Sequence, residues 1–269
     1  MKTNIFCLPA FEDNYIWCLH RNHSLVVVDP GDAAPVLNYL TSGNDRLAAI
    51  LVTHHHRDHT GGVLELAQRF QVPVYAPATE HIAGTSHALS GGEKITIPEL
   101  ALELQVLDVA GHTRGHLAYY AAPVATDNSE SGGEPGYLFC GDTVFGCGCG
   151  RLFEGTAAQL HQALTKIAAL PPDTLIYSAH EYTESGIRFA LTVEPNNPAT
   201  VVRGDAVARL RREGRSTVPF TLEQEKQTSP FFRCGQEAVI QAVQQRYDAS
   251  AGRHALTVFT DLAPEKRTP

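Results

Sequence analysis

One histidine-rich stretch, residues 53–59, constrains this chain more than any other feature. It reads Thr-His-His-His-Arg-Asp-His and supplies four candidate metal ligands, which are His54, His56, Asp58 and His59. Imidazole nitrogens and carboxylate oxygens are ligands that zinc, iron and manganese accept. An apolar run at 49–52 precedes the stretch, and a helix-like run at 63–67 follows it. The pattern predicts a metal-binding loop between a strand and a helix, where open α/β sheets commonly place their sites.

Three further strand-like runs are each followed by a histidine or an aspartate. The runs and their polar residues are 104–109 with His112, 137–140 with Asp142, and 174–178 with His180. Strands that each deliver such a residue at the carboxyl end can converge on one point. Together with the first stretch they supply five histidines and two aspartates. Seven ligands are too many for one tetrahedral ion, but they suit two ions that share a carboxylate.

These motifs resemble the metallo-β-lactamase superfamily and, within it, the hydroxyacylglutathione hydrolase (glyoxalase II) family. The residues that carry the resemblance are 13–17, 53–59, 111–116, 141–143, 148–155 and 180–183. The stretch 53–59 is typical of the whole superfamily. The stretches Gly-Cys-Gly-Arg and His-Glu-Tyr-Thr favour the glyoxalase II branch. The resemblance implies an α/β fold, an αβ/βα sandwich followed by a smaller all-helical C-terminal domain.

The resemblance also implies how the ligands divide between two divalent ions. It assigns His54, His56 and His112 to the first ion, Asp58, His59 and His180 to the second, and Asp142 to both. Asp58 and Asp142 are then the catalytic carboxylates. Residues two apart on an extended loop point the same way, so His55 is expected to point away from the ions. Zinc is the expected metal, with iron or manganese as the alternatives that this ligand set accepts.

The family's substrate is a glutathione thioester, S-(2-hydroxyacyl)glutathione, of which S-D-lactoylglutathione is the main example. Its hydrolysis to glutathione and D-lactate is the second step of methylglyoxal detoxification. Arg151, Tyr182 and Arg233 match family positions that hold the glutathione part, and Phe153 is the fourth expected substrate contact. Arginine suits the glutathione carboxylates because its planar fork binds them in a bidentate way. Phe153 stands where many relatives have Tyr, and a lysine common near Arg233 in some relatives is absent.

The expected mechanism is attack on the thioester carbonyl by a hydroxide bound to the two ions. A metal can lower the pKa of bound water to about 7, so no separate side-chain base is required. A thiol of pKa about 8.5 leaves readily as the anion, whereas an amide nitrogen must first be protonated. The lack of an obvious additional acid motif is therefore consistent with a thioester substrate.

Other reactions of the same superfamily stay open at this point. They are a lactonase, a β-lactamase, a nuclease, and a persulfide dioxygenase that uses one iron. The complete second ligand set and the helical tail count against the dioxygenase. A net charge of −8 without a basic stripe argues against a nucleic-acid partner. We therefore expect a small-molecule substrate, no nucleic acid, and a monomer.

The composition predicts a cytoplasmic protein without a membrane partner. The N-terminus lacks a secretory pattern, and no apolar run reaches the roughly 18 residues that span a bilayer. Six cysteines in such a chain are expected to be reduced thiols. Cys147 and Cys149 are also expected to be free thiols rather than metal ligands, because two thiols on one glycine-rich loop without a second pair are a weak metal signal.

The sequence changes character near residue 170. Strand-like runs dominate before it, at 5–8, 15–19, 25–28, 49–52, 72–76, 104–109 and 137–140. Helical spacing dominates after it, at 186–193, 199–213, 221–227 and 237–247. We therefore predict a metal-binding domain over 1–170 and a helical glutathione-binding domain over 171–269.

Three local features complete the prediction. Helical patterns are also expected at 35–41 and 156–170. Residues 126–136 have a loop composition and are expected to form an exposed, mobile insertion without chemistry. Asp29, which follows a strand-like run, is expected to support the metal loop rather than to bind metal.

Overall fold

The computed structural model describes residues 3–124, 133–247 and 255–262 of the chain. By contacts the chain divides into two compact units. The first unit consists of Met1–Asp108 and Gly115–Gly141, and the second of Val109–Arg114 and Asp142–Pro269. These units follow spatial contacts and cut the chain at three places. The domains predicted at 1–170 and 171–269 stay a prediction.

The first sheet of the first unit has the strand order β1-β2-β3-β4-β5-β6. Its strands are β1 (Asn4–Ala10), β2 (Asn14–Arg21), β3 (Ser24–Val28), β4 (Arg46–Leu51), β5 (Val74–Pro77) and β6 (His87–Leu89). The first three form an antiparallel meander, and β3 to β6 are parallel to one another. The strands predicted near residues 5, 15, 25, 49 and 72 are confirmed. The short strand β6 was not predicted, because it has three residues, of which only Leu89 is buried.

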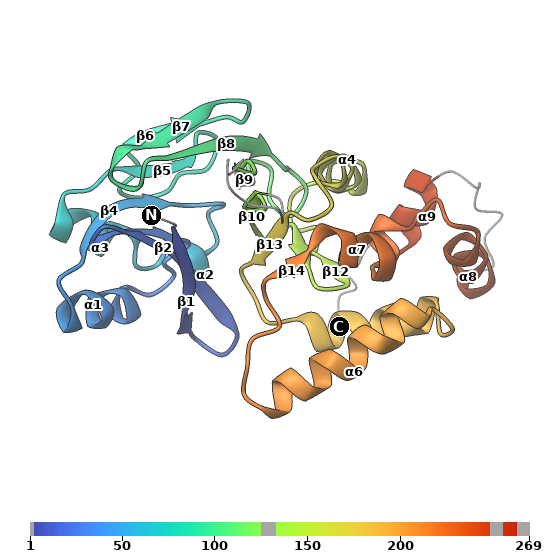
Figure 1. Ribbon diagram of the computed structural model, residues 1–269. Helices are drawn as coiled ribbons and strands as arrows, with labels where there is room; N and C mark the ends of the chain where they lie inside the picture. The colour runs from blue at the N-terminus through green and yellow to red at the C-terminus, as the bar shows by residue number, and fades with distance from the viewer. Residues whose placement is uncertain (1–2, 125–132, 248–254, 263–269) are drawn as a thin grey trace. The chain divides into compact units, whose positions relative to one another are not determined.

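Helices α1 (Ala33–Ser42) and α3 (Val63–Phe70) cover this sheet on one side, as Figure 1 shows. Helix α1 begins at Asp32, whose side chain accepts a hydrogen bond from the Ala34 amide at 2.9 Å, a typical N-cap. The apolar faces of both helices share one buried cluster with the strands; its members include Val36, Leu66, Ile50 and Val74. The buried cluster continues through Val52, and the histidine-rich stretch begins at the next residue.

Four antiparallel strands form the remaining sheet region of the first unit. They are β7 (Lys94–Ile97), β8 (Leu102–Asp108), β9 (Leu117–Ala121) and β10 (Tyr137–Gly141), with the short 3₁₀ helix η1 (Pro98–Leu100) between β7 and β8. Strand β9 was not predicted. All of its residues are buried. The buried Tyr119 hydroxyl donates to the Val52 carbonyl at 2.8 Å and so ties β9 to the segment before the metal loop.

The second unit contains the helices predicted after residue 156. They are α4 (Ala157–Ala168), α5 (Thr183–Val193), α6 (Pro198–Arg212), α7 (Leu222–Thr228) and α8 (Glu237–Tyr247), with η2 (Pro230–Phe232) before α8. Helix α9 (Ala255–Leu262) was not predicted. Strand β13 (Leu175–Ser178), predicted from the sequence, pairs with the unpredicted β14 (Phe220–Thr221). Strands β11 (Val144–Phe145) and β12 (Gly148–Cys149) form a small hairpin.

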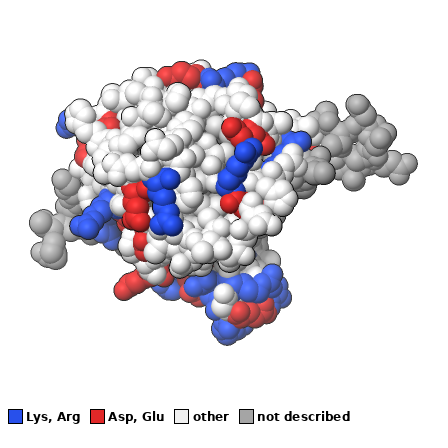
Figure 2. Space-filling view, turned by 90° about the vertical axis from the view of Figure 1, so that its left-hand side faces the viewer, with Lys and Arg blue, Asp and Glu red and all other residues white. Residues whose placement is uncertain are grey.

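The predicted insertion at 126–136 lies largely outside the described residues; of the rest, Glu134 pairs with Val124 in an isolated bridge. Among the helices of the described part, none combines the length and apolar character needed to cross a bilayer. On the face drawn in Figure 2, acidic and basic side chains lie close to one another between larger uncharged areas.

Candidate metal centre

The first unit carries four of the predicted ligands on the segment that follows β4. His56 is the N-cap residue of the short helix α2 (Arg57–Thr60), and Asp58 and His59 lie on that helix. The side chains of His54 and His59 are fully buried, whereas His56 and Asp58 are partly exposed. The local fold therefore places two ligands inside the unit and two at its surface.

The ligand atoms of this segment lie close to one another. The Nε2 atom of His54 is 3.1 Å from Nδ1 of His56, and Nε2 of His59 is 3.4 Å from a carboxylate oxygen of Asp58. These are the atoms that bind a cation when the imidazole is neutral and the carboxylate ionised. A cation shared by such lone pairs relieves their mutual repulsion, so the arrangement fits metal ligands.

Asp29 holds two of these histidines in the required tautomer. Its carboxylate accepts the Thr53 amide and hydroxyl, both at 2.7 Å, and Nδ1 of His59 at 3.1 Å. The Thr53 hydroxyl donates to Asp29, so it accepts from Nδ1 of His54 at 3.0 Å. Both rings thus carry their proton on Nδ1 and present Nε2 as the ligand atom. Asp29 lies near enough to join an ion with His54 and His59, but its oxygens already serve as acceptors. The prediction that it supports the loop is confirmed.

Two supporting residues of the first unit were missed by the sequence analysis. The Asn14 side-chain amide donates to a carboxylate oxygen of Asp58 at 3.0 Å. The buried carboxylate of Glu80 accepts the amide of His55 at 2.6 Å and the amide of Gly115 at 2.9 Å. Nδ1 of the His55 ring also lies 3.0 Å from Glu80, so this ring is engaged with a carboxylate.

A cavity of about 470 Å³ lies beside Asp58 within the first unit. Its lining includes Phe11, Gly31, Arg57, Asp58 and Glu65. Phe11 is 61% exposed at the turn between β1 and β2. Gly31 is required here, because an added Cβ would lie 1.8 Å from the carbonyl oxygen of Asp58. The close backbone approach sets the position of Asp58 against the loop after β3.

The second unit carries the other three predicted ligands, His112, Asp142 and His180, all of them buried. The two oxygens of Asp142 face different histidines. One oxygen lies 3.3 Å from Nε2 of His112, and the other lies 3.3 Å from Nε2 of His180. A carboxylate placed in this way suits a bridge between two cations, with one histidine beside each.

The neighbours of these two histidines fix their rings. Nδ1 of His112 lies 2.8 Å from the carbonyl oxygen of Arg151, which can only accept, so Nδ1 carries the proton and Nε2 faces Asp142. A metal-bound histidine usually donates its other nitrogen in this way. The ring of Tyr182 stacks on His180 with centroids 4.8 Å apart and planes 9° apart. The ring of Phe153 meets His112 edge-on at 5.2 Å.

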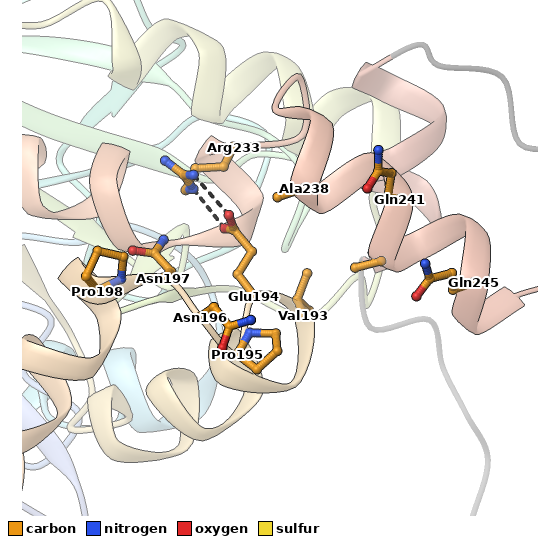
Figure 3. Close-up of a pocket in the computed structure, with 11 residues that line it drawn as sticks. Val193, Glu194, Pro195, Asn196, Asn197, Pro198, Arg233, Ala238, Gln241 and Gln245 are labelled. Carbon is orange, nitrogen blue, oxygen red and sulfur yellow. Dashed lines mark hydrogen bonds and ion pairs between the residues drawn. The ribbon is translucent and has the colours of Figure 1, made fainter.

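The four residues predicted to hold substrate differ in their surroundings. Arg151, Phe153 and Tyr182 are exposed, with Phe153 at 47% and Tyr182 at 38%. Arg233 instead makes a bidentate ion pair with Glu194, at 2.8 and 2.9 Å, as Figure 3 shows. The hydrogen bond to Glu194 raises the pKa of Arg233 above its usual value. The role of all four in binding substrate stays a prediction.

The Arg233 pair lies at a cavity of about 530 Å³ within the second unit. Its lining is largely uncharged and includes Asn196, Asn197, Gln241 and Gln245 (Figure 3). Glu194 accepts from Nε and from one Nη atom of Arg233, so part of this guanidinium is already engaged within the protein.

All six cysteines are free thiols in the structure, as predicted. Burial raises the pKa of the Cys147 thiol to about 11 and raises that of Cys149 further. The thiolate is the form that binds metal. The raised pKa values therefore disfavour these two thiols as metal ligands.

Comparisons with known proteins show the family of the chain. The family model of the metallo-β-lactamase superfamily matches residues 13–180, and that of the hydroxyacylglutathione hydrolase C-terminus matches residues 181–267. The hydroxyacylglutathione hydrolase of Dechloromonas aromatica (strain RCB) is 52% identical over 261 residues, which cover 97% of this chain and 93% of that protein.

Solved structures show the same fold at lower identity. ETHE1 from Myxococcus xanthus has a TM-score of 0.61 and 21% identity, covering 86% of this chain and 84% of its own. TTHA1623 in a di-iron-bound form has a TM-score of 0.55 and 22% identity, covering 85% of this chain and 99% of its own. The predicted metallo-β-lactamase fold with a helical C-terminal region is thus confirmed. The chain belongs to the hydroxyacylglutathione hydrolase family of the metallo-β-lactamase superfamily.

Proposed function

We propose that the chain hydrolyses S-(2-hydroxyacyl)glutathione, with S-D-lactoylglutathione as its main substrate, to glutathione and a 2-hydroxy acid. As a member of its family the chain is a thiolester hydrolase. We further propose that this is the second step of methylglyoxal detoxification and takes place in the cytoplasm, in a monomeric enzyme.

The observation that carries the proposal is the position of Asp142 between two histidines. Each of its oxygens faces a different Nε2 atom at 3.3 Å, which is the donor arrangement a pair of cations requires. We propose that His54, His56 and His112 hold one divalent ion, that Asp58, His59 and His180 hold the other, and that Asp142 touches both. Zinc is the proposed metal. The di-iron form of TTHA1623 keeps iron as an alternative.

Divalent ions bound by these ligands supply Lewis acidity and make hydroxide available near neutral pH. The residues of the chain supply orientation. Asp29 and the Arg151 carbonyl keep the protons of His59 and His112 on Nδ1. Asn14 holds one oxygen of Asp58 at 3.0 Å, which leaves the other oxygen to orient a nucleophile. The exposed rings of Phe153 and Tyr182 form apolar walls beside His112 and His180.

The proposed function is tested by turnover of four substrate classes on one metal-analysed sample. S-D-lactoylglutathione should be hydrolysed at least about 10³-fold more efficiently than a β-lactam, a lactone or a phosphodiester, since glutathione contacts contribute binding energy that those compounds cannot use. The readouts are kcat/KM for each compound and metal content per chain. The proposal is overturned if the thioester is left intact while another class is cleaved. Consumption of a persulfide with oxygen by a one-iron enzyme would overturn it equally.

Arg151→Ala should raise KM for S-D-lactoylglutathione about tenfold, with kcat changed less than about twofold. The exposed guanidinium is proposed to bind a glutathione carboxylate, and a charge-assisted hydrogen bond of this kind contributes on the order of 1.5 kcal/mol. The backbone carbonyl that holds His112 remains in the variant, so the metal ligands are unaffected. Steady-state kinetics measure both constants.

Arg209→Ala is the matched control, because it removes an exposed arginine of the same unit from helix α6. Its KM should equal that of the parent. An Arg151→Ala enzyme whose kcat falls while KM stays constant contradicts the proposed substrate contact.

A further inference from the structure

The hairpin of β11 and β12 joins two parts of the metal centre of the second unit. It begins after Asp142 and ends before Arg151, whose carbonyl holds Nδ1 of His112 at 2.8 Å. The base of the hairpin is tightly packed at Gly150. A Cβ added to Gly150 would lie 2.0 Å from the carbonyl oxygen of Asp142 and 3.0 Å from Nδ1 of His112. Any movement of the hairpin must therefore shift Asp142, His112 or both.

The turn of this hairpin is hydrogen-bonded to the buried carboxylate of Glu225. Cys147, at the turn, has φ +58°, a left-handed conformation that is uncommon for a residue with a side chain. Its amide donates to both oxygens of Glu225, at 3.0 and 3.2 Å. Glu225 lies on α7 and is 0% exposed. The carboxylate thus fixes an otherwise strained turn that is 78 residues away in the sequence.

Glu225 is itself held by Arg203 on α6. The guanidinium lies 2.6 Å from Glu225 and 2.7 Å from the Thr228 hydroxyl, to which it donates. Arg203 is only 7% exposed and packs over the Phe220 ring at 5.0 Å. A second guanidinium nitrogen is buried without a hydrogen-bond partner among the described residues. Taking both charges out of water costs about as much free energy as their attraction returns, so the pair contributes little net stability. The main contribution of the pair is therefore to fix the position of the Glu225 carboxylate.

We propose that Glu225, held by Arg203, is a positioning residue that anchors the tip of the 142–151 hairpin and thereby places Asp142 and His112 for metal binding. The proposal rests on the proposed role of Asp142 and His112 as metal ligands. Arg203 fixes the Glu225 carboxylate, and the carboxylate fixes the Cys147 amide. Because the hairpin is short, a fixed turn also fixes the position of its base beside Asp142 and His112.

The experiment compares two double variants that differ only in the acceptor offered to the Cys147 amide. Both Arg203→Met/Glu225→Leu and Arg203→Met/Glu225→Gln remove the ion pair without leaving an unpaired charge, and such replacement is often nearly neutral for stability. Only the Gln side chain keeps an oxygen for the amide. We expect the Leu variant to bind metal 10- to 100-fold more weakly than the Gln variant, as removal of a supporting contact around a metal site typically does.

Alkylation of the Cys147 thiol is a second readout, which reports directly on the contact between Glu225 and the turn. The Cys147 thiol is fully buried, and burial raises its pKa to about 11, so alkylation requires the tip to open. Iodoacetamide labelling mapped by peptide mass spectrometry should be at least about tenfold faster at Cys147 in the Leu variant than in the Gln variant. Cys234, buried in the same unit, is the internal control and should label equally in both.

Val258→Ala controls for lost stability alone, since it truncates a buried side chain of α9 away from the hairpin. It should lower Tm and leave metal affinity and Cys147 labelling unchanged. The proposal is overturned if the Leu and Gln variants bind metal equally, or if they label equally at Cys147.

The unmodified protein gives a further test if a double variant does not fold. Coupling between two sites is reciprocal, so an anchor that favours metal binding must itself be strengthened by metal. Zinc loading should slow Cys147 labelling at least tenfold relative to Cys234, and an unchanged ratio overturns the proposal. If the parent binds no metal or leaves the thioester intact, the proposed function fails instead, and the labelling difference between the two double variants still tests the anchor.

Discussion

Asp142→Ala is expected to lose most of its bound metal and at least about 10³-fold in kcat/KM for S-D-lactoylglutathione. Within the second unit, each oxygen of Asp142 faces a different histidine nitrogen at 3.3 Å, so its removal takes a ligand from both proposed ions. Electrostatic stabilisation by a metal contributes several kcal/mol, and each 1.36 kcal/mol corresponds to a factor of ten in rate. Metal analysis and steady-state kinetics on one preparation measure both losses.

Asp173→Ala serves as the matched control, because Asp173 is an exposed carboxylate of the same unit. It should keep the metal content and turnover of the parent. Asp142→Asn refines the test, since an amide retains one oxygen and should hold more metal than alanine does. An Asp142→Ala enzyme with full metal content and full turnover rules out the bridging role of this carboxylate.

The residues of the candidate metal centre could be picked out from the sequence because their signal is local. Each ligand follows a short apolar run, and β4, β8, β10 and β13 are those runs in the structure. The supporting role of Asp29 beside the loop was also predicted, and its carboxylate accepts from Thr53 and His59. Local spacing thus sufficed to pick out the candidate ligands and the strands that present them.

The supporting contacts could not be predicted because they join residues far apart in the chain. Asn14 meets Asp58 across 44 positions, and Glu225 meets Cys147 across 78. Glu225 and Arg203 occupy helices whose spacing alone predicts ordinary surface charges. Only tertiary packing turns them into a buried pair. Arg233 shows the same limit, because a motif cannot reveal that Glu194 already occupies its guanidinium.

The prediction of secondary structure failed where local sequence preference and tertiary packing favour different structures. Strand β9 is buried over its whole length, so no alternation of polar and apolar residues marks it. Strands β11 and β12 have two residues each, too few to give a pattern in the sequence. The turn between them is held by a side chain of α7, a contact that the sequence of the loop does not reveal.

Chelation should inactivate the enzyme and lower its Tm by about 10 °C. The nitrogen and oxygen atoms of these candidate ligand pairs lie 3.1 to 3.4 Å apart, so they repel one another when the cations are removed. A ligand at 1,000 times its Kd stabilises a fold by about 4 kcal/mol, and 1 kcal/mol shifts Tm by about 2–4 °C in a chain of this size. Dipicolinate treatment followed by calorimetry, metal analysis and turnover measures the effect.

Restoring the stripped protein with zinc, iron or manganese in turn should return both Tm and turnover, and the metal that returns most turnover identifies the one the site uses best. Asp142→Ala is the control here as well: it already lacks most of its metal, so chelation should lower its Tm by less than about 2 °C. A stripped parent that keeps its turnover would show that hydrolysis does not depend on metal. A parent that loses turnover without a shift in Tm would show that metal binding does not stabilise the fold, and the stabilisation expected from metal binding would be wrong.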